Sequence, residues 1–378
     1  MKLLHFSDTH LGFSEYFKID PLTGLNQREQ DFYDAWQQVV DAILTHAPDI
    51  AVHAGDLFHT PRPSNRAIRI ALESIKKISD AGIPLVFIAG NHETPRIRTT
   101  GSIFESLILF PNVYAAYSST YQKFRVGDAD IFCLPHCSLT EEMEKAIEEL
   151  KAEAKAKAKA KAKAKAKWRV FVSHGAWGGE FGMGEFNEQR LPDVEAVTGL
   201  TFDYIALGHY HRYVAVKENA CYSSSTERTS LNEHNSTCGY VLLDLESGER
   251  SYQEIKTRSM IKLPVLDCHD LTTAAIYDKL NELATPEIRD AIVQLILANI
   301  ESDAFIKLDM REIENIFKDA FYLEKQLSRK ITETNRIAAQ SKIESLPVEF
   351  ERFLASVENK ELDKEKIAAL GVQYLDES

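Results

Sequence analysis

Eight side chains with metal-binding or proton-transfer chemistry stand in five short polar motifs. They are two Asp, one Asn and five His, in Asp8-Thr9-His10, Gly55-Asp56, Gly90-Asn91-His92-Glu93, Ser173-His174 and Gly208-His209-Tyr210-His211. Oxygen and imidazole ligands without a thiolate favour Mn, Fe or Zn ions over a soft-metal or calcium site. One carboxylate, which we predict to be Asp56, can bridge two cations about 3.5 to 4 Å apart. Such a pair activates water for attack on a phosphate, so no protein nucleophile is needed.

The spacing inside two motifs supports this prediction. Asp8-x-His10 and His209-x-His211 each place two ligands on the same side of an extended segment, because strand side chains repeat at a period of two. Single triplets of this kind also arise by chance, and a lone buried His is commonly a satisfied core residue. The prediction of a metal site therefore depends on all five motifs together.

The elements that must position these motifs are six short apolar runs, of which all but the fourth precede a motif. The runs cover residues 3–6, 49–52, 84–89, 131–134, 169–172 and 204–207. Near-continuous apolar strands indicate a sheet covered on both faces, as in α/β folds. Residues 27–47 and 65–81 have helical periodicity, and further strands at 220–222 and 240–243 predict a second sheet. Ligands of α/β sheets bind at the carboxyl ends of strands, so we expect the motifs to converge there.

Composition places the chain among ordinary globular proteins. Its 378 residues suffice for a large catalytic domain with small appendages, and 44% hydrophobic with 27% charged residues argue against disorder. The amino terminus lacks a signal-peptide apolar core, and no apolar run approaches the length of about 18 residues of a membrane span. We therefore expect a cytoplasmic protein without membrane contact.

The cysteines and the net charge argue against further classes of protein. Five scattered Cys without C-x-x-C spacing (133, 137, 221, 238 and 268) predict reduced thiols rather than a disulfide framework or a zinc finger. The net charge of -13 argues against a uniformly basic nucleic-acid coat. Local basic clusters can still bind a phosphate backbone, so charge alone does not decide whether DNA is a ligand.

Three further segments lie outside the motifs. The Lys/Ala tract at 151–167 predicts a continuous exposed helix, either merely solvated or a patch that contacts DNA. Beyond residue 258, strands at 262–266, 291–300 and 320–327 alternate with helices at 272–283 and 310–317, which predicts a small α+β domain. Amphipathic segments at 347–357 and 362–374 follow a polar stretch at 332–344. This helical hairpin is expected to dock a partner or to pack on its own chain.

The five motifs, in this order across the first 250 residues, resemble the calcineurin-like metallophosphoesterases. The resemblance implies a two-sheet αββα sandwich. It also implies that Asp8, His10, Asp56 and His211 bind one metal, and that Asp56, Asn91, His174 and His209 bind the other. His92 would stand outside both ligand sets, where it could stabilise the transition state or protonate the leaving oxygen.

Neighbouring residues narrow the resemblance. Gly55-Asp56-Leu57-Phe58-His59 with Arg62-Pro63, the run from Gly90 to Arg96, and the run from Tyr222 to Arg228 resemble the nuclease subunit of the double-strand-break repair complex. This subunit is called SbcD in bacteria and meiotic recombination eleven in archaea and eukaryotes, and His59 is closer to the archaeal type. The family commonly has Gly-Ser-Thr at Ser224-Ser225-Thr226, and the Lys/Ala tract has no counterpart in it.

That narrower resemblance implies a domain plan, an activity and, in a prokaryote, association with the nucleoid. The plan is a nuclease domain at 1–257, a DNA-facing capping domain at 258–330, a linker at 331–345 and a helical segment at 346–378 that binds an ABC-type, SMC-like coiled-coil ATPase. The activity is that of a 3'-to-5' exonuclease on duplex ends and an endonuclease on single strands and hairpins, with two Mn²⁺ ions per subunit.

Several further residues receive roles from the resemblance. His59 would orient the substrate phosphate beside His92, or support the site by hydrogen bonding. Arg28, Arg62, Arg66, Arg96 and Arg98 would contact the DNA backbone, or be solvated surface charges. The family also forms homodimers, for which Ile103, Phe104, Leu107 and Ile108 would supply an apolar surface, unless they belong to the monomer core.

Two other functions stay open. An enzyme of the same fold could hydrolyse a small phosphodiester such as a cyclic nucleotide, although it would not need the appended domain or the terminal helices. A non-catalytic scaffold for the ATPase would require a broken site, whereas none of the eight motif residues is missing.

Overall fold

The computed structural model describes residues 1–94, 101–159, 166–178, 181–183 and 188–330, with residues 350, 353–354, 366–368 and 370–371. Several predictions fall outside the described residues. They concern Arg96 and Arg98, residues 160–165 of the Lys/Ala tract, the linker at 331–345 and most of the segment at 346–378.

The first sheet has six strands in the order β14-β13-β1-β2-β3-β4. The strands are β1 (Lys2–Phe6), β2 (Ile50–His53), β3 (Leu85–Ile88), β4 (Val113–Ala116), β13 (Gly239–Asp244) and β14 (Glu249–Glu254). Strands β1 to β4 run parallel, with Leu3 opposite Ile50, whereas β1 and β13, and β13 and β14, are antiparallel. The carboxyl ends of β1 to β4 therefore meet at one edge of this sheet.

The second sheet also has six strands, in the order β11-β12-β10-β7-β6-β5. They are β5 (Gln122–Val126), β6 (Ala129–Leu134), β7 (Trp168–His174), β10 (Tyr204–Gly208), β11 (Tyr213–Lys217) and β12 (Ala220–Ser223). Its four central strands are parallel, and the edge strands β5 and β11 are antiparallel to their neighbours. The short strands β8 (Ala176–Trp177) and β9 (Arg190–Leu191) form a separate parallel pair.

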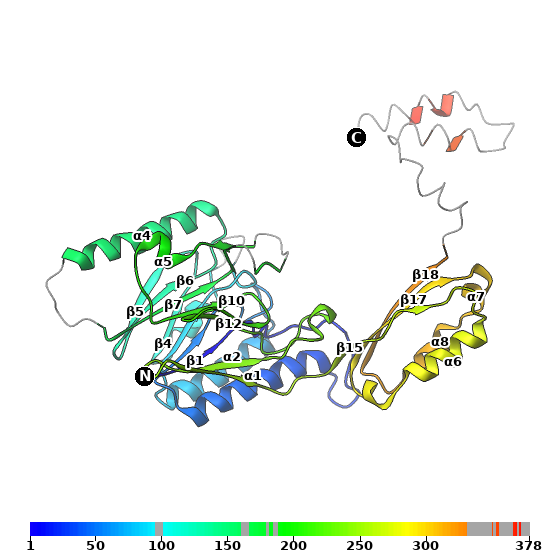
Figure 1. Cartoon of the computed structure of the whole chain (residues 1–378), viewed down its shortest axis with the longest axis horizontal. Coiled ribbons are helices and arrows are strands. Elements are labelled where there is room, and N and C mark those ends of the chain that lie inside the picture. The colour runs from blue at the N-terminus through cyan, green and yellow to red at the C-terminus, as the bar shows by residue number, and fades with distance from the viewer. Residues whose placement is uncertain are drawn as a thin grey trace. The chain divides into compact units, whose positions relative to one another are not determined.

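Side-chain alternation along β1 shows how the two sheets pack. Leu4 and Phe6 join a core cluster with α1 (Gln27–His46) and α2 (Asn65–Asp80), whereas Leu3 joins a second cluster with residues of the other sheet. A third cluster lies between the second sheet, α4 (Thr140–Lys159) and α5 (Val194–Thr198). The layers are helices, sheet, sheet and helices (Figure 1). The predicted αββα sandwich is confirmed.

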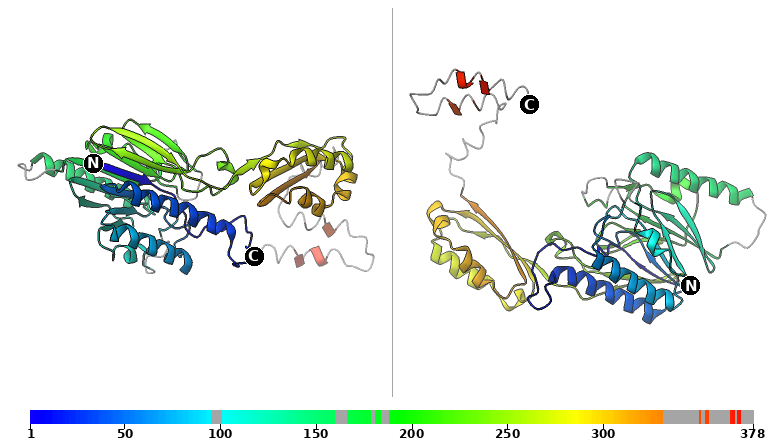
Figure 2. Two further views of the ribbon diagram at one scale, coloured as in Figure 1. Left: turned by 90° about the horizontal axis from the view of Figure 1, so that it is seen from below. Right: turned by 180° about the vertical axis from the view of Figure 1, so that it is seen from behind.

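The two predicted helices of the first layer are confirmed to within one residue at their ends. The Asn26 side chain accepts a hydrogen bond from the Arg28 backbone N–H and caps α1, and Ser64 caps α2 through Ala67. The helices lie side by side on one face of the sandwich (Figures 1 and 2). Helix α4 confirms the prediction of a helix for residues 151–159 of the tract, but the prediction is wrong for Ala166 and Lys167, which are not helical and directly precede β7.

The predicted second sheet exists, but the prediction of which strands form it was wrong. Strands β6, β7 and β10, expected among the first set, belong to the second sheet, whereas β13, expected in the second sheet, pairs with β1 in the first. In a sandwich covered on both sides every central strand is apolar on both faces. Hydrophobic periodicity therefore cannot tell which sheet a strand joins.

The chain beyond β14 forms a four-stranded sheet in the order β15-β17-β16, with β18 paired to β17. Its elements are β15 (Met260–Lys262), β16 (Leu266–Asp267), β17 (Ile292–Ile300), β18 (Tyr322–Arg329), α6 (Thr273–Leu283), α7 (Ser302–Lys307) and α8 (Met310–Ile316). The single strand expected at 262–266 is wrong, because β15 and β16 flank Pro264, which cannot donate to a ladder.

The chain divides into two compact units. The first holds Met1–Leu263, Leu283–Leu295 and Glu312–Glu324, and the second holds Pro264–Glu282, Ile296–Arg311 and the chain from Lys325 onward. Strands β17 and β18 contribute residues to both units. The domain limits at 257, 330 and 345 stay predictions.

Two expectations from composition can be compared with the structure. All five cysteines are buried and free, as predicted for reduced thiols. In the described part of the chain, no helix has both the length and the apolar composition that crossing a membrane requires.

Candidate metal centre

The five polar motifs follow carboxyl ends of parallel strands in both sheets. Asp8 comes two residues after β1, Asp56 three residues after β2, and Asn91 three residues after β3. In the second sheet, His174 ends β7 and His209 follows β10 directly. The predicted convergence is confirmed, since side chains from both sheets meet within hydrogen-bonding distance.

The backbone at the motifs is held in a conformation that L-residues rarely adopt. Asp8, His10, Asp56 and His209 have φ angles of 52°, 47°, 60° and 101°. The Asp8 N–H donates to the Gly55 carbonyl over 2.9 Å, and the His10 N–H donates to the Asp56 carbonyl over 2.9 Å. Backbone strain of this kind persists only where surrounding contacts impose it, and it concentrates at functional sites.

Two motif glycines allow the ligands to approach each other. A Cβ atom on Gly90 would lie 2.1 Å from Asp56 Oδ1, and one on Gly55 would lie 2.3 Å from His174 Nδ1. Gly55 also has a φ of 98°, which disfavours any other residue. A side chain at either position would therefore clash with a ligand, so both residues must be glycine. At Gly55 the positive φ angle is a second reason.

One group of potential metal ligands comprises Asp8, His10 and His211, all buried. The Nε2 atoms of His10 and His211 face each other over 3.2 Å, and His211 Nε2 lies 3.8 Å from Asp8 Oδ1. Two imidazole nitrogens at this distance must share a proton or a cation, because their lone pairs would otherwise repel. This donor set fits a divalent cation.

A second group comprises Asp8, Asp56 and His174. His174 Nε2 lies 3.3 Å from Asp56 Oδ2 and 2.9 Å from Asn91 Oδ1, while its Nδ1 faces the Ala54 carbonyl over 2.8 Å. Asp56 Oδ2 also lies 3.9 Å from His10 Nε2. Asp56 thus lies close to a histidine of each group, as expected for a carboxylate that binds two metals. Asp8 is a member of both groups as well. The division of ligands between two metals stays a prediction.

His209 lies beside the second group without belonging to it. Its ring centroid is 5.3 Å from that of His174, and its backbone N–H donates to the Asp8 carboxylate over 3.0 and 3.1 Å. Its Nε2 faces Glu188 over 2.6 Å. The ring of this predicted ligand thus contacts a carboxylate outside the predicted set.

The charges of the cluster suit cation binding. Burial opposes the charge of Asp56, but His174 and His92 hold the pKa of that carboxyl well below its usual value. Burial opposes the charge of His174 too, yet Asp56 raises the pKa of His174 to about 9. A protonated imidazole thus compensates the carboxylates at neutral pH, a role that a cation can take over. Burial and the neighbouring His92 keep the pKa of His10 well below its usual value, which favours a neutral ligand.

Glu93 has a supporting role that was not predicted from the sequence. Its carboxylate accepts hydrogen bonds from the backbone N–H groups of Asp56, Phe58 and Gly90, over 3.1, 2.7 and 2.8 Å. Burial and the charge of Asp56 raise the pKa of Glu93 to about 8. The side chain ties the loop after β2 to the loop after β3. Its place in Gly90-Asn91-His92-Glu93 was the available signal.

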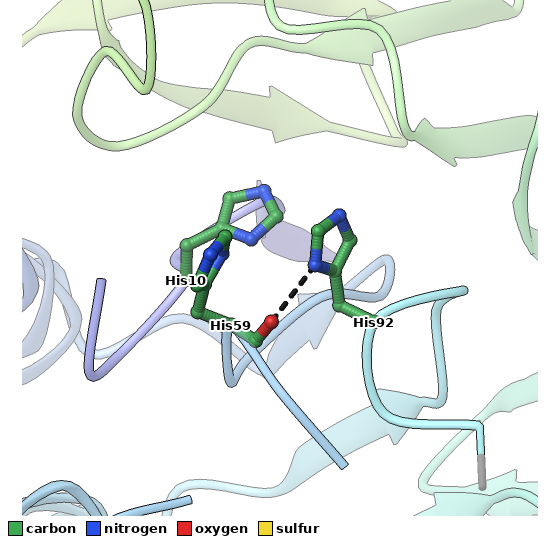
Figure 3. Close-up of side chains that lie close together, drawn as sticks. All are labelled: His10, His59 and His92. Atoms are coloured by element: carbon green, nitrogen blue, oxygen red, sulfur yellow. Dashed lines mark hydrogen bonds between the residues drawn. The ribbon is translucent and has the colours of Figure 1, made fainter. Parts of the chain in front are cut away.

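His92 and His59 lie next to each other at the centre, with His10 beside them (Figure 3). The ring centroids of His59 and His92 are 5.0 Å apart in a stacked arrangement, and those of His10 and His92 are 4.7 Å apart. His92 Nδ1 faces the His59 carbonyl over 2.8 Å, and the His92 backbone N–H donates to Asp56 Oδ1 over 3.0 Å. His92 therefore adjoins both predicted ligand sets.

The arginines predicted to contact DNA differ in exposure. Arg28 is fully buried, and its guanidinium pairs with Asp31 over 2.9 Å and with Glu227 over 3.3 Å, besides donating to the Arg228 carbonyl. The prediction that Arg28 contacts DNA is wrong, because its guanidinium is fully buried and both of its terminal nitrogens donate within this network. Arg62 and Arg66 are exposed, and Arg66 pairs with Glu29. Both remain predictions.

Arg28→Ala is expected to lower the free energy of unfolding by about 3–5 kcal/mol, because it leaves buried Glu227 without its cation. Urea denaturation followed by circular dichroism measures this. Arg66→Ala is the matched control, since its pair with Glu29 is 41% exposed on the arginine side and should contribute about 0–1 kcal/mol. Equal stability of the two variants would contradict the structural role of Arg28.

The residues predicted for a dimer surface also differ in their exposure to solvent. Phe104 and Leu107, in α3 (Phe104–Leu107), are fully buried in the core cluster of the first helical layer. Their assignment to a dimer interface is wrong, because they pack inside the monomer. Ile103 is partly buried and Ile108 is 41% exposed. Homodimerisation stays a prediction that, of the four residues, these two alone can support.

Comparison with known proteins gives consistent results. The profile of the calcineurin-like phosphoesterase family matches residues 1–213. The chain is similar to the DNA double-strand break repair protein Mre11 of Thermoplasma acidophilum, with 31% identity over 265 residues, 68% of this chain and 65% of that protein. The protein of the same name from Methanocaldococcus jannaschii is 28% identical over 290 residues, 74% of this chain and 70% of that protein.

These relatives extend beyond the match. The protein of the same name from Sulfurisphaera tokodaii is 30% identical over 213 residues, which are 56% of this chain and 49% of that protein. Across these three relatives, the match covers 49% to 70% of the relative's own length. A solved structure from Thermus thermophilus is 12% identical, covers 68% of this chain and 99% of that chain, and has a TM-score of 0.41. A likeness at that level is too weak to support an argument.

Proposed function

The chain belongs to the calcineurin-like phosphoesterase family, and we propose that it is a two-metal DNA nuclease of double-strand-break repair. The observation that carries this proposal is the gathering of two buried carboxylates and four buried histidines at the carboxyl ends of both sheets, with His92 beside them. The similar proteins are named for DNA double-strand break repair, which supports DNA as the substrate.

We propose the two predicted ligand sets as the residues that hold the metals. Asp8, His10, Asp56 and His211 would hold one, and Asp56, Asn91, His174 and His209 the other. Two divalent cations, proposed to be Mn²⁺, would polarise a phosphate and activate water there. The chain's own contribution is a donor set already placed by strained loops and by Glu93.

His92 is proposed to act on the phosphodiester directly. An Nδ1–H bond to the His59 carbonyl would fix the ring and leave Nε2 directed away from that carbonyl. A proton on Nε2 could then be donated to the leaving oxygen, or hydrogen-bond to the phosphate in the transition state. The side chain of His59, stacked on His92, is proposed to orient the same phosphate.

The proposed function is tested by digestion of end-labelled duplex DNA and circular single-stranded DNA with Mn²⁺, with Mg²⁺ or with chelator. We expect Mn²⁺-dependent shortening of the duplex from its 3' ends and cutting of the circle. A small substrate, bis-p-nitrophenyl phosphate, is digested in parallel. Cleavage of the small diester without cleavage of either DNA would indicate a small-molecule phosphodiesterase, and cleavage of none would indicate the scaffold.

We further propose an ABC-type coiled-coil ATPase as the partner, bound through residues 346–378. This proposal depends on the sequence resemblance alone, since that segment lies largely outside the described residues. Co-purification of the ATPase with the full chain but not with a chain ending at residue 345 is the expected result. Equal recovery with both chains would remove the segment from the interface.

A further inference from the structure

Two glutamates outside the predicted ligand sets each contact one histidine of His209-x-His211. Glu188 Oε1 lies 2.6 Å from His209 Nε2, and Glu233 Oε1 lies 2.9 Å from His211 Nδ1. An ionised carboxylate only accepts hydrogen bonds, so in each pair the imidazole nitrogen that faces it must carry the proton. The two contacts use different ring nitrogens, and they therefore select different tautomers.

We propose that Glu188 and Glu233 are positioning residues that fix opposite tautomers of the two histidines. His209 then presents Nδ1, and His211 presents Nε2, as the unprotonated nitrogen whose lone pair can be donated to a metal. Carboxylates that hold metal-binding histidines in this way also raise the basicity of the ligand. The inference deepens the proposed function, because it depends on the same two-metal site.

The surroundings of His211 agree with this assignment. Its Nε2, the nitrogen that Glu233 leaves without a proton, lies 3.2 Å from His10 Nε2 and 3.8 Å from Asp8 Oδ1, within the first ligand group. Glu233 is itself buried, and the backbone N–H and hydroxyl of Thr229 donate to it over 2.8 and 2.9 Å. The carboxylate is therefore fixed before any metal binds.

The surroundings of His209 give Glu188 a comparable role. The His209 backbone is fixed by its bonds to Asp8, so rotation of the ring is the freedom that remains for Glu188 to restrict. The neighbouring Gln189 donates through Nε2 to the His174 carbonyl over 3.0 Å. Adjacent residues thus contact both histidines predicted for the second metal. Glu188 is also the more accessible of the two glutamates, with 16% of its side chain exposed.

The tautomers can be read without a metal. In metal-free protein labelled with ¹⁵N-histidine, long-range ¹H–¹⁵N correlation spectra at pH 8 are expected to show His209 protonated at Nε2 and His211 protonated at Nδ1. In Glu188→Ala the single tautomer of His209 should be lost while that of His211 stays. The same tautomer on both histidines, or an unchanged His209 signal in Glu188→Ala, would overturn the proposal.

Calorimetric titration with MnCl₂ supplies the second readout. Glu188→Ala is expected to weaken one of two Mn²⁺ sites by about 10–100-fold. Glu233→Gln, which keeps one oxygen to accept from the Thr229 backbone N–H, should weaken the other site. Glu246→Ala is the control, because this exposed carboxylate pairs with Lys167 and should leave both sites unchanged.

The two readouts separate this inference from the proposed function. Wild-type protein that binds no Mn²⁺ would contradict the two-metal site, and the tautomers would still decide the role of the glutamates. Wild-type binding of two ions with unchanged affinity in Glu188→Ala and Glu233→Gln would overturn the positioning role and leave the nuclease proposal intact.

Discussion

Asp56→Asn is expected to abolish DNA cleavage, with a loss of at least about 10³-fold. Metal Lewis acids supply several kcal/mol of transition-state stabilisation, and each loss of about 1.4 kcal/mol slows a reaction tenfold. Asp56 Oδ2 lies between His174 and His10, at 3.3 and 3.9 Å, so its charge serves both sides of the centre. The amide keeps an oxygen for the His92 N–H but removes the negative charge on which binding of both proposed cations would depend.

Metal binding by this variant can be measured independently of cleavage. Mn²⁺ should raise the midpoint of thermal unfolding of the wild type, because a ligand that binds the folded state stabilises it, and the increase should disappear in Asp56→Asn. Asp49→Asn is the matched control, since this exposed carboxylate precedes the same strand and accepts from the Lys2 N–H over 2.7 Å. Wild-type cleavage by Asp56→Asn would refute Asp56 as the bridge.

Much of the centre was predictable because local patterns specify strands and strand ends. The apolar runs before Asp8, Asp56, Asn91, His174 and His209 become β1, β2, β3, β7 and β10. Parallel strands align their carboxyl ends, so the motifs had to converge if the strands paired in parallel. The pairing of strands into two sheets was not predictable in the same way, since both faces of each central strand are apolar.

The carboxylates that support the ligands were harder to find. Glu233 lies 22 residues from His211 along the chain, and Glu188 lies 21 residues from His209. Neither follows a strand in a recognisable motif, and an isolated Glu is most often a surface residue. Only the packing of the loops brings these carboxylates to the imidazole rings. Glu93 differs, because it stands inside a motif and binds backbone groups of the same loops.

The two errors in residue roles have a common physical origin. Arg28 was predicted to contact DNA because guanidinium groups bind phosphate, but it is buried beside Glu227, which is 199 residues away in sequence. Phe104 and Leu107 were assigned to an exposed apolar face, yet Phe104 lies near Phe87 of β3, with ring centroids 6.3 Å apart. In both cases the long-range partner, which the local sequence does not reveal, decides burial.

His92→Ala is expected to retain two bound Mn²⁺ ions while DNA cleavage falls by about 10²- to 10⁴-fold, the usual contribution of general acid–base catalysis. Its Nδ1 is occupied by the His59 carbonyl, and His92 belongs to neither of the two groups that contain the buried carboxylates. Calorimetry with MnCl₂ and cleavage of labelled DNA measure the two effects. Exposed His46, at the end of α1, is the control when replaced by Ala.

The same variant can also distinguish the two roles proposed for His92. A substrate with a p-nitrophenolate leaving group needs no proton on its leaving oxygen, unlike DNA, whose leaving group is a deoxyribose oxygen. If the His92 imidazole protonates the leaving oxygen, His92→Ala should therefore lose less cleavage rate on the p-nitrophenyl substrate than on DNA. If the imidazole stabilises the phosphate instead, the loss should be equal for both leaving groups. His59→Ala keeps the backbone carbonyl that holds His92 Nδ1 and should therefore lose less activity than His92→Ala. Wild-type cleavage of DNA by His92→Ala would exclude this residue from both roles.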